Sequence, residues 1–267
     1  MTKKPLAFGI LAALMYALML LVWGRNFTVQ LIYVLLAMAA VMVGMRAIWL
    51  YGVDSLHGSS LRWILWGVGF WVIGEIVWLV SEWWLMVDPF PSWADGFYLA
   101  GYGLMYVGLY REISHVGISA IVKNKALFGL LTATAVILVG VVGYYGIYQA
   151  LDPGASFWEN SISLAYGVGD MLLVFGSFLI LLMLREYKGG KLVNVFYPLA
   201  VGFLAILAGD VGFAMYYDEY IGHIRPYIYL DALWVAGYLM FLVAYYYAGK
   251  LAIDIRLKLP EEGVAHA

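Results

Sequence analysis

The sequence contains no cysteine, which excludes disulfide bonds, thiol catalysis and metal sites that depend on cysteine ligands. It also has little charge: Asp, Glu, Lys and Arg make up 12% of its 267 residues, about half the share found in soluble domains. The net charge of −2 argues against a nucleic-acid-binding surface. No GxSxG, HExxH, P-loop or dinucleotide-binding fingerprint is present. The sequence therefore shows no sign of a soluble enzyme or of a nucleic-acid partner.

Long apolar runs dominate the chain, and 65% of its residues are hydrophobic. A membrane-spanning helix needs about 20 apolar residues to cross a hydrocarbon layer of ~30 Å. These runs predict an all-α integral membrane protein that forms a single polytopic domain over residues 1–267. Met1 to Lys4 precede the first run, which has no small-residue cleavage site, so we expect a retained helix. The eight expected spans cover residues 5–23, 28–50, 62–86, 93–113, 126–149, 161–186, 193–217 and 226–251.

The Lys and Arg residues divide unevenly between the two sides of an eight-helix bundle. Thirteen of them fall on one side, and only Arg25 and Arg225 fall on the other. Cytoplasmic loops carry the excess of positive charge, so this division predicts that both termini are cytoplasmic. An odd number of spans would scramble the pattern. We therefore expect a multi-pass plasma-membrane protein with the lipid bilayer as its environment and a cytoplasmic tail over residues 252–267.

Two halves of the sequence resemble one another. The pair Gly74-Glu75 is echoed by Gly209-Asp210. A longer set repeats at a constant offset of 136 residues, in which Asp95, Ala100, Gly101, Tyr102, Val107 and Tyr110 are echoed by Asp231, Ala236, Gly237, Tyr238, Val243 and Tyr246. The offset corresponds to four spans, which predicts a parallel duplication of spans 1–4 (about 5–113) and spans 5–8 (about 126–251). A two-helix ancestral unit and chance similarity between Gly- and Tyr-rich helices are the alternatives.

Carboxylates occur where a bilayer disfavours them. An ionised group at the bilayer centre costs at least ~3 kcal/mol, and no Lys or Arg lies within the outer halves of the spans to neutralise them. The direction of each span places these acids in the outer half of the bundle. Glu75 and Glu82 are seven residues apart, which puts them on one helix face. The acids inside or at the edge of the spans are Glu75, Glu82, Asp95, Asp170, Asp210 and Asp231.

Three interpretations of these acids compete. Asp95 and Asp231 are expected near helix N-termini, where a carboxylate caps free N–H groups and meets the positive end of the helix dipole. Glu75, Asp170 and Asp210 suit a shared, outward-facing polar pocket for a small molecule, a lipid headgroup or a cation. The third interpretation is proton or ion transfer. Crowded carboxylates favour the protonated form of one another, so a pocket and protonation are compatible.

Aromatic side chains are expected to share this pocket with the acids. The predicted ligand-binding set adds Trp78, Tyr102, Tyr166, Trp234 and Tyr238 to the six acids.

The histidines carry less information. His57, His115 and His266 are expected to be solvated loop or tail residues. His223 lies in an outer turn close to the acids, so it is a candidate metal ligand with Asp210 or Asp231, although its spacing matches no zinc pattern. The sequence indicates no particular cofactor.

Several motifs resemble a known kind of membrane region. The pattern PSWADGFYLAGY at 91–102, preceded by GEIVWLV at 74–80, is similar to the membrane-embedded N-terminal region of many bacterial diguanylate cyclases and some sensor kinases. The likeness continues with LAYGVGDMLLV at 164–174, AGDVGFAMYYD at 208–218 and LDALWVAGYL at 230–239. In that family the region is a sensory input module. No cyclase or kinase domain follows span eight here, so we expect a stand-alone domain whose output depends on a cytoplasmic signalling partner.

The sequence thus favours a sensor-type membrane protein with an outward-facing acidic and aromatic pocket. One alternative is a small transporter or channel that uses Glu75, Asp170 and Asp210 along its path. Another is a membrane enzyme that acts on lipids with carboxylates as general acid or base. The short inner loops and the lack of a nucleophile–base motif make an enzyme the less expected alternative.

Overall fold

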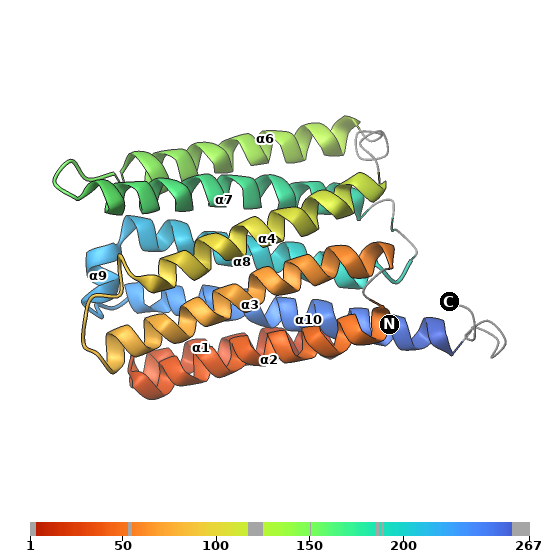
Figure 1. The fold of residues 1–267 in the computed structure, drawn as a ribbon, viewed down its shortest axis with the longest axis horizontal. Coiled ribbons are helices and arrows are strands. Elements are labelled where there is room, and N and C mark those ends of the chain that lie inside the picture. Colours follow the sequence, from red (N-terminus) through yellow and green to blue (C-terminus); the bar gives the residue numbers. More distant parts are fainter. Residues whose placement is uncertain are drawn as a thin grey trace.

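A computed structural model describes residues 4–52, 55–116, 125–149, 151–184, 187 and 190–257. Helix makes up 86% of the structure, and the described residues contain no strand. Figure 1 shows the elements, which are α1 (Lys4–Trp23), α2 (Phe27–Tyr51), α3 (Leu56–Trp83), α4 (Trp93–Val116), α6 (Lys125–Val141), η1 (Val142–Tyr148), α7 (Phe157–Met183), α8 (Val193–Met215), α9 (Tyr217–Ile221), η2 (Tyr227–Tyr229) and α10 (Leu230–Arg256).

Seven helices among the described residues are long and apolar enough to cross a membrane, which confirms the prediction of an all-helical, multi-pass membrane protein. They are α1, α2, α3, α6 continued into η1, α7, α8, and α10 with η2. The remaining long helix, α4, has 24 residues but is less apolar because it carries several charged and tyrosine residues. Large apolar side chains such as Leu14, Trp49 and Trp66 point outward around the bundle, as lipid-facing residues do.

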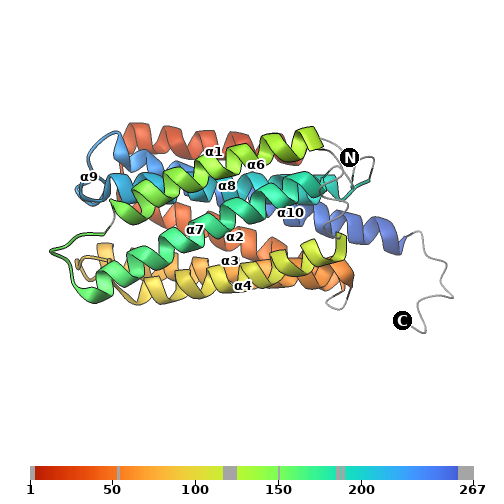
Figure 2. The same ribbon diagram turned by 90° about the horizontal axis from the view of Figure 1, so that it is seen from above.

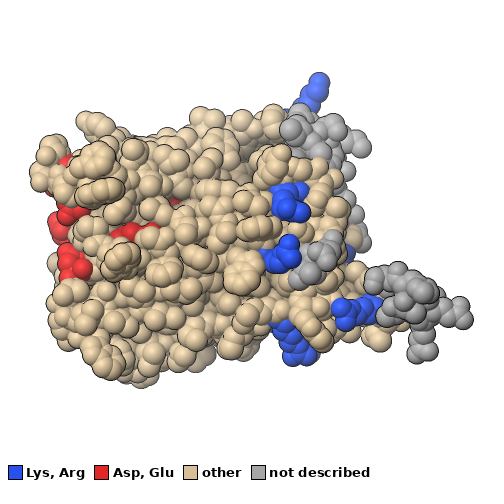
Figure 3. Space-filling model, in the orientation of Figure 1, with Lys and Arg blue, Asp and Glu red and all other residues tan. Residues whose placement is uncertain are grey.

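The long helices run roughly side by side, so their connections gather at two ends (Figure 1). One end holds the α1–α2, α3–α4, η1–α7 and α8–α10 connections, and Asp and Glu gather on its surface (Figure 3). We call it the acidic end. Both chain termini lie toward the opposite end, where Lys and Arg gather, and we call this the basic end.

Two tight hairpins form the centre of the bundle. Helix α3 packs along α4, and α8 packs along α10. Helix α2 contacts α3 and α10, whereas α7 contacts α8 and α4 (Figure 2). Each of these two outer helices therefore joins the two hairpins.

Glycine pairs allow the close approach within each hairpin. In α3–α4, a Cβ added to Gly101 would lie 2.4 Å from the Trp71 ring and 2.9 Å from the Gly67 carbonyl oxygen. In α8–α10, a Cβ added to Gly237 would lie 2.6 Å from Ile206 and 3.1 Å from the Gly202 carbonyl oxygen. Small residues at crossings are the usual means by which membrane helices pack closely.

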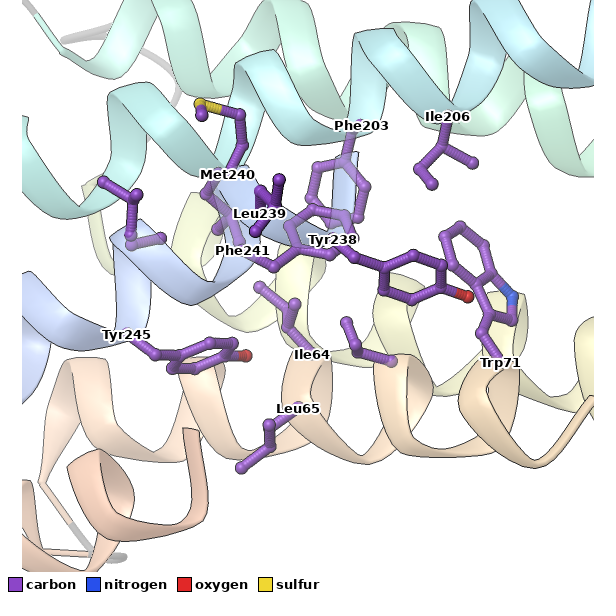
Figure 4. Packing of buried hydrophobic residues seen from close by; sticks show 14 of the residues in the cluster. Ile64, Leu65, Trp71, Phe203, Ile206, Tyr238, Leu239, Met240, Phe241 and Tyr245 are labelled. Carbon is purple, nitrogen blue, oxygen red and sulfur yellow. The ribbon is translucent and has the colours of Figure 1, made fainter. Parts of the chain in front are cut away.

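Apolar side chains fill the bundle on the basic-end side of Trp71 and Ile206. Ile64, Phe203 and Phe241 are buried there (Figure 4). Further buried members of this core are Leu61, Leu65, Met105, Leu109, Phe196, Leu199 and Tyr245. The described core therefore offers no continuous line of charged groups between the two ends.

Two predicted boundaries are wrong. Helix α3 begins at Leu56, several residues before the expected span, because Ser55 caps its N-terminus by accepting a hydrogen bond from the Gly58 backbone N–H. Helix α10 continues to Arg256, so the expected tail at 252–267 is helical over its first residues. Residues 258–267, including His266, lie outside the described residues.

Candidate ligand-binding cavity

A cavity of about 560 Å³ runs from the acidic end into the bundle. Both central hairpins line it, together with α2, α7 and residues of the acidic-end connections. Nine of the eleven residues predicted from sequence lie on its wall, namely Glu75, Trp78, Asp95, Tyr102, Tyr166, Asp170, Asp210, Trp234 and Tyr238. The other two, Glu82 and Asp231, lie beside the cavity and take part in a separate ion-pair network.

The cavity wall is strongly acidic. Its carboxylates are Glu75, Asp88, Asp95, Asp152, Glu159, Asp170, Asp210, Asp218 and Glu219. No Lys, Arg or His is among the described residues that line it. Aromatic rings from all sides, including Tyr33, Trp71 and Phe213, cover much of the remaining wall. The cavity thus combines uncompensated negative charge with the faces and edges of aromatic rings.

Asp170 of α7 and Asp210 of α8 meet at the hydroxyl of Tyr102 of α4. The Tyr102 Oη lies 2.6 Å from Asp170 Oδ1 and 3.1 Å from Asp210 Oδ2. A phenol hydroxyl carries one proton, so it can donate to only one of the two carboxylates. The second contact is favourable only when a further positive charge or proton is present. This arrangement is therefore ready to receive a cation.

Glu75 and Asp210 each face aromatic donors. Glu75 Oε1 accepts a hydrogen bond of 3.1 Å from the Tyr238 hydroxyl, and Tyr98 is also a hydrogen-bond partner of Glu75. Asp210 Oδ1 accepts a bond of 2.8 Å from the Trp234 indole Nε1–H. Tyr33 lines the cavity, is only 3% exposed and lies beside Glu75, yet its hydroxyl makes no well-formed hydrogen bond with the described residues.

Asp95 has a double role near the mouth of the cavity. Its Oδ2 accepts a bond of 2.6 Å from the Ser92 backbone N–H, and its Oδ1 accepts one of 2.8 Å from the Tyr166 hydroxyl. The Ser92 hydroxyl in turn accepts a bond from the Ala94 N–H. Asp95 therefore stabilises the start of α4 as predicted, and it also joins α4 to α7.

The prediction that Asp231 caps a helix is wrong. Helix α10 has no side-chain cap, and the completely buried Asp231 accepts hydrogen bonds from side chains instead. Its partners are the Tyr220 hydroxyl at 2.7 Å, the Gln30 amide and the Arg25 Nε at 3.2 Å. A short 3₁₀ turn over Tyr227–Tyr229 precedes α10 and continues the backbone hydrogen bonding.

Arg25 overturns the expectation that no cation neutralises the acids. It lies in the α1–α2 turn and folds inward, so that only 6% of it is exposed. Its two terminal nitrogens bind both carboxylate oxygens of Glu82, the Nη2–Oε2 distance being 2.7 Å. The guanidinium carbon also lies 4.4 Å from the centre of the Tyr220 ring. One arginine thus serves Glu82 and Asp231 together.

The surroundings keep Arg25 charged. Burial acts to lower the pKa of Arg25, but Tyr220, Asp231 and Glu82 outweigh it and raise the pKa overall. Burial likewise raises the pKa of Tyr220, which therefore remains a neutral hydrogen-bond donor. At the mouth, burial and the hydrogen bond to Asp88 raise the pKa of Tyr217, whose hydroxyl lies 2.8 Å from Asp88 Oδ1.

The proposed metal site at His223 is not supported. His223 Nε2 lies 2.9 Å from Arg25 Nη1 and 3.0 Å from Glu82 Oε1, and its ring stacks on Trp83. It contacts neither Asp210 nor Asp231 in any described interaction. Among the described residues, no group of three or more His, Asp or Glu side chains could hold a metal ion.

His57 differs from the expected solvated loop residue. It lies in the first turn of α3, and its Nδ1 is 2.7 Å from Oε1 of the buried Glu112. The Tyr187 hydroxyl binds the same oxygen at 2.7 Å. This second polar cluster lies at the basic end, far along the helices from the acidic cavity. His115 lies in the last turn of α4, not in a loop.

Sequence reasoning missed several residues of the site. Tyr98 could have been found, because it lies 136 residues before Trp234 and the two occupy corresponding positions of the repeat. Gln30 and Tyr33 of α2 gave no signal, since single polar residues in an apolar run are common. Arg25 was assigned to the membrane surface because it falls in a turn.

Comparisons of the chain with protein-family models, curated proteins and solved structures give no match.

Proposed function

We propose that this membrane protein binds a small organic cation in its acidic cavity and acts as a sensor-type recognition domain. The observation that carries the proposal is the wall of the cavity, on which nine carboxylates and many aromatic rings face no Lys, Arg or His among the described residues. The internal cation, Arg25, is already bound to Glu82 and Asp231. The cavity acids therefore need their positive partner from outside the chain.

Aromatic rings favour an organic cation over a bare metal ion. Ammonium groups are attracted to the faces of Trp and Tyr rings as well as to carboxylates. Trp71, Tyr102 and Tyr166 surround the acids, and the Tyr102 ring makes edge contacts with both of the other rings. A free alkylammonium ion and the ammonium headgroup of a lipid share this chemistry.

The proposed topology has eight spans, with α4 as the eighth and both termini in the cytoplasm. Helix α4 is long enough, at 24 residues, and its polar side chains, including Asp95, Tyr102 and Glu112, face other helices and not lipid. The gathering of Lys and Arg at the basic end supports a cytoplasmic location for that end (Figure 3). The cavity would then open to the outside of the cell.

Topology can be tested directly because the chain lacks cysteine. We expect a Gly154→Cys variant to react with a membrane-impermeant thiol reagent added to intact cells, because Gly154 is exposed at the acidic end. A Gly190→Cys variant, exposed at the basic end, should react only after the membrane is permeabilised. The opposite labelling pattern would overturn the proposed orientation.

A parallel duplication is supported by paired contacts at one sequence offset. The Gln30 amide binds Asp231, and the Tyr166 hydroxyl binds Asp95. Positions 30 and 166, and positions 95 and 231, are each 136 residues apart. The glycine crossings of the two hairpins correspond in the same way. Each half therefore contributes a side chain to the acid of the other half.

The resemblance to sensory membrane regions of cyclases and kinases supports the sensor role, in which a cytoplasmic partner would supply the output. The transporter alternative gains less support, because apolar residues such as Ile64, Phe203 and Phe241 fill the basic-end half of the bundle. For a lipid-modifying enzyme, the cavity offers carboxylates but no described nucleophile–base pair with His.

Thermal unfolding of the purified protein in detergent tests cation binding. We expect n-butylammonium and tetramethylammonium to raise the melting temperature, whereas the neutral isostere 1-butanol should not. At 100 times its Kd, a ligand adds about 2.7 kcal/mol to the free energy of unfolding. Asp210→Asn should abolish the shift, because the amide keeps the shape and the Trp234 contact but removes the charge.

Asp254→Asn is the matched control for the same change of charge. Asp254 lies at the basic end, where it pairs with Lys191, so its replacement should leave the cation shift intact. Equal stabilisation by 1-butanol and n-butylammonium would refute the proposal, as would an unchanged shift in the Asp210→Asn variant.

A further inference from the structure

The cavity contains two half-sites built on the same plan. In one, Glu75 of α3 accepts hydrogen bonds from Tyr98 of α4 and from Tyr238 of α10. In the other, Asp210 of α8 accepts them from Trp234 of α10 and from Tyr102 of α4. Each acid thus has one aromatic donor from its own hairpin and one tyrosine from the opposite hairpin. The two exchanged tyrosine contacts are both 3.1 Å long.

A glycine precedes the acid in each half-site and fixes the position of the aromatic donor. A Cβ added to Gly74 would lie 2.7 Å from the Tyr98 ring. One added to Gly209 would lie 2.5 Å from the Trp234 indole nitrogen. The missing side chain lets each ring lie against the helix that carries the acid, so that its donor reaches the carboxylate. The two acids are therefore held in the same local geometry.

Neither half-site has a described cationic partner of its own. Tyr33, whose buried hydroxyl lacks a well-formed hydrogen bond, lies beside Glu75 and can accept one from an ammonium group. On the other side, Tyr102 brings Asp170 against Asp210, which makes that half-site the more negative one. Position 34, which corresponds to Asp170 at the repeat offset, is Val34.

We infer that the cavity takes a linear diammonium ligand, with one ammonium group at Glu75 and the other at Asp210. The inference rests on the proposed function and narrows it to one ligand class, the α,ω-diaminoalkanes. Aromatic residues between the two acids, such as Trp71 and Tyr238, provide an apolar wall for the connecting methylene groups. A monoammonium ion would satisfy one acid and leave the other unpaired.

A chain-length series tests this inference on the unmodified protein. Melting temperatures and Kd values are measured for α,ω-diaminoalkanes with three to eight carbons and for n-alkylammonium ions of the same lengths. We expect one diamine length to bind about 100-fold more tightly than the matching monoamine, because the second ammonium binds within the same molecule. Shorter and longer diamines should bind more weakly than this optimum.

Variants of the two acids then assign the ends of the ligand. Glu75→Gln or Asp210→Asn alone should lower diamine affinity to the monoamine level and erase the optimum of chain length. The Asp254→Asn control should keep both. If diamines and monoamines bind equally at every length, the diammonium inference is wrong but cation binding stands. If neither class binds, both fail. The series on the unmodified protein decides the matter even when a variant does not fold.

Discussion

Replacement of Arg25 by methionine is expected to lower the free energy of unfolding by about 3–5 kcal/mol, the usual cost of removing one partner from a buried ion pair. Arg25 binds Glu82 through both terminal nitrogens and Asp231 through Nε, and its side chain is completely buried. Methionine fills similar volume but leaves both carboxylates without a counter-charge. Unfolding in a graded denaturing detergent, followed by circular dichroism, measures the loss.

Two controls separate the lost charge from a general effect of the substitution. Arg225→Met changes the other arginine of the acidic end, which is exposed, and should cost less than about 0.5 kcal/mol. Adding Glu82→Gln and Asp231→Asn to the Arg25→Met background should restore part of the stability, since the unpaired charges are then gone. An Arg25→Met protein as stable as the parent would show that the network contributes nothing.

Alanine at Gly101 is expected to destabilise the α3–α4 hairpin by about 1–3 kcal/mol, the usual cost of overpacking. The new methyl group would lie 2.4 Å from the Trp71 ring and 2.9 Å from a backbone carbonyl oxygen, so the helices must separate. Trp71 lines the cavity and donates its indole N–H to the Tyr98 carbonyl oxygen at 3.0 Å. The same substitution should therefore also weaken cation binding.

Gly103, one turn position away on α4, provides a matched control with the opposite sign. A Cβ added there meets nothing within 4 Å. Gly103→Ala should leave stability unchanged or raise it by up to about 1 kcal/mol, because alanine favours helix over glycine. Similar behaviour of both variants in the same unfolding assay would contradict the close-crossing explanation. Gly237→Ala is expected to repeat the Gly101 result in the α8–α10 hairpin.

The sequence was informative about the cavity because helical periodicity and span direction fix the depth of a residue. Glu75, Asp170 and Asp210 fall at similar depths in three different helices, so a compact bundle brings them to one space. The repeat placed Tyr102 and Tyr238 on equivalent helix faces. Both face the cavity for that reason.

Residues in turns could not be placed in the same way. Arg25 and His223 lie in connections whose course depends on the packing of neighbouring helices, and hydropathy says only that they are near a membrane surface. The path of the α1–α2 turn carries Arg25 inward to Glu82, which no local pattern encodes. Asp231 was assigned to backbone capping because its position at a helix start is typical of caps, but buried side-chain donors took that place.

Helix α10 connects the two ends of the molecule without a break. Its Trp234 and Tyr238 contact the cavity acids, and the same helix runs on to Arg256, beyond the other helices of the bundle (Figure 1). At 27 residues it is about 40 Å long. An unkinked rod of this length has no joint to absorb a twist, so a small rotation imposed near Tyr238 would reach the protruding end undiminished. A single spin label at an introduced Ile255→Cys would report that rotation as a changed spectrum when the cavity fills, and an unchanged spectrum would show that α10 stays still.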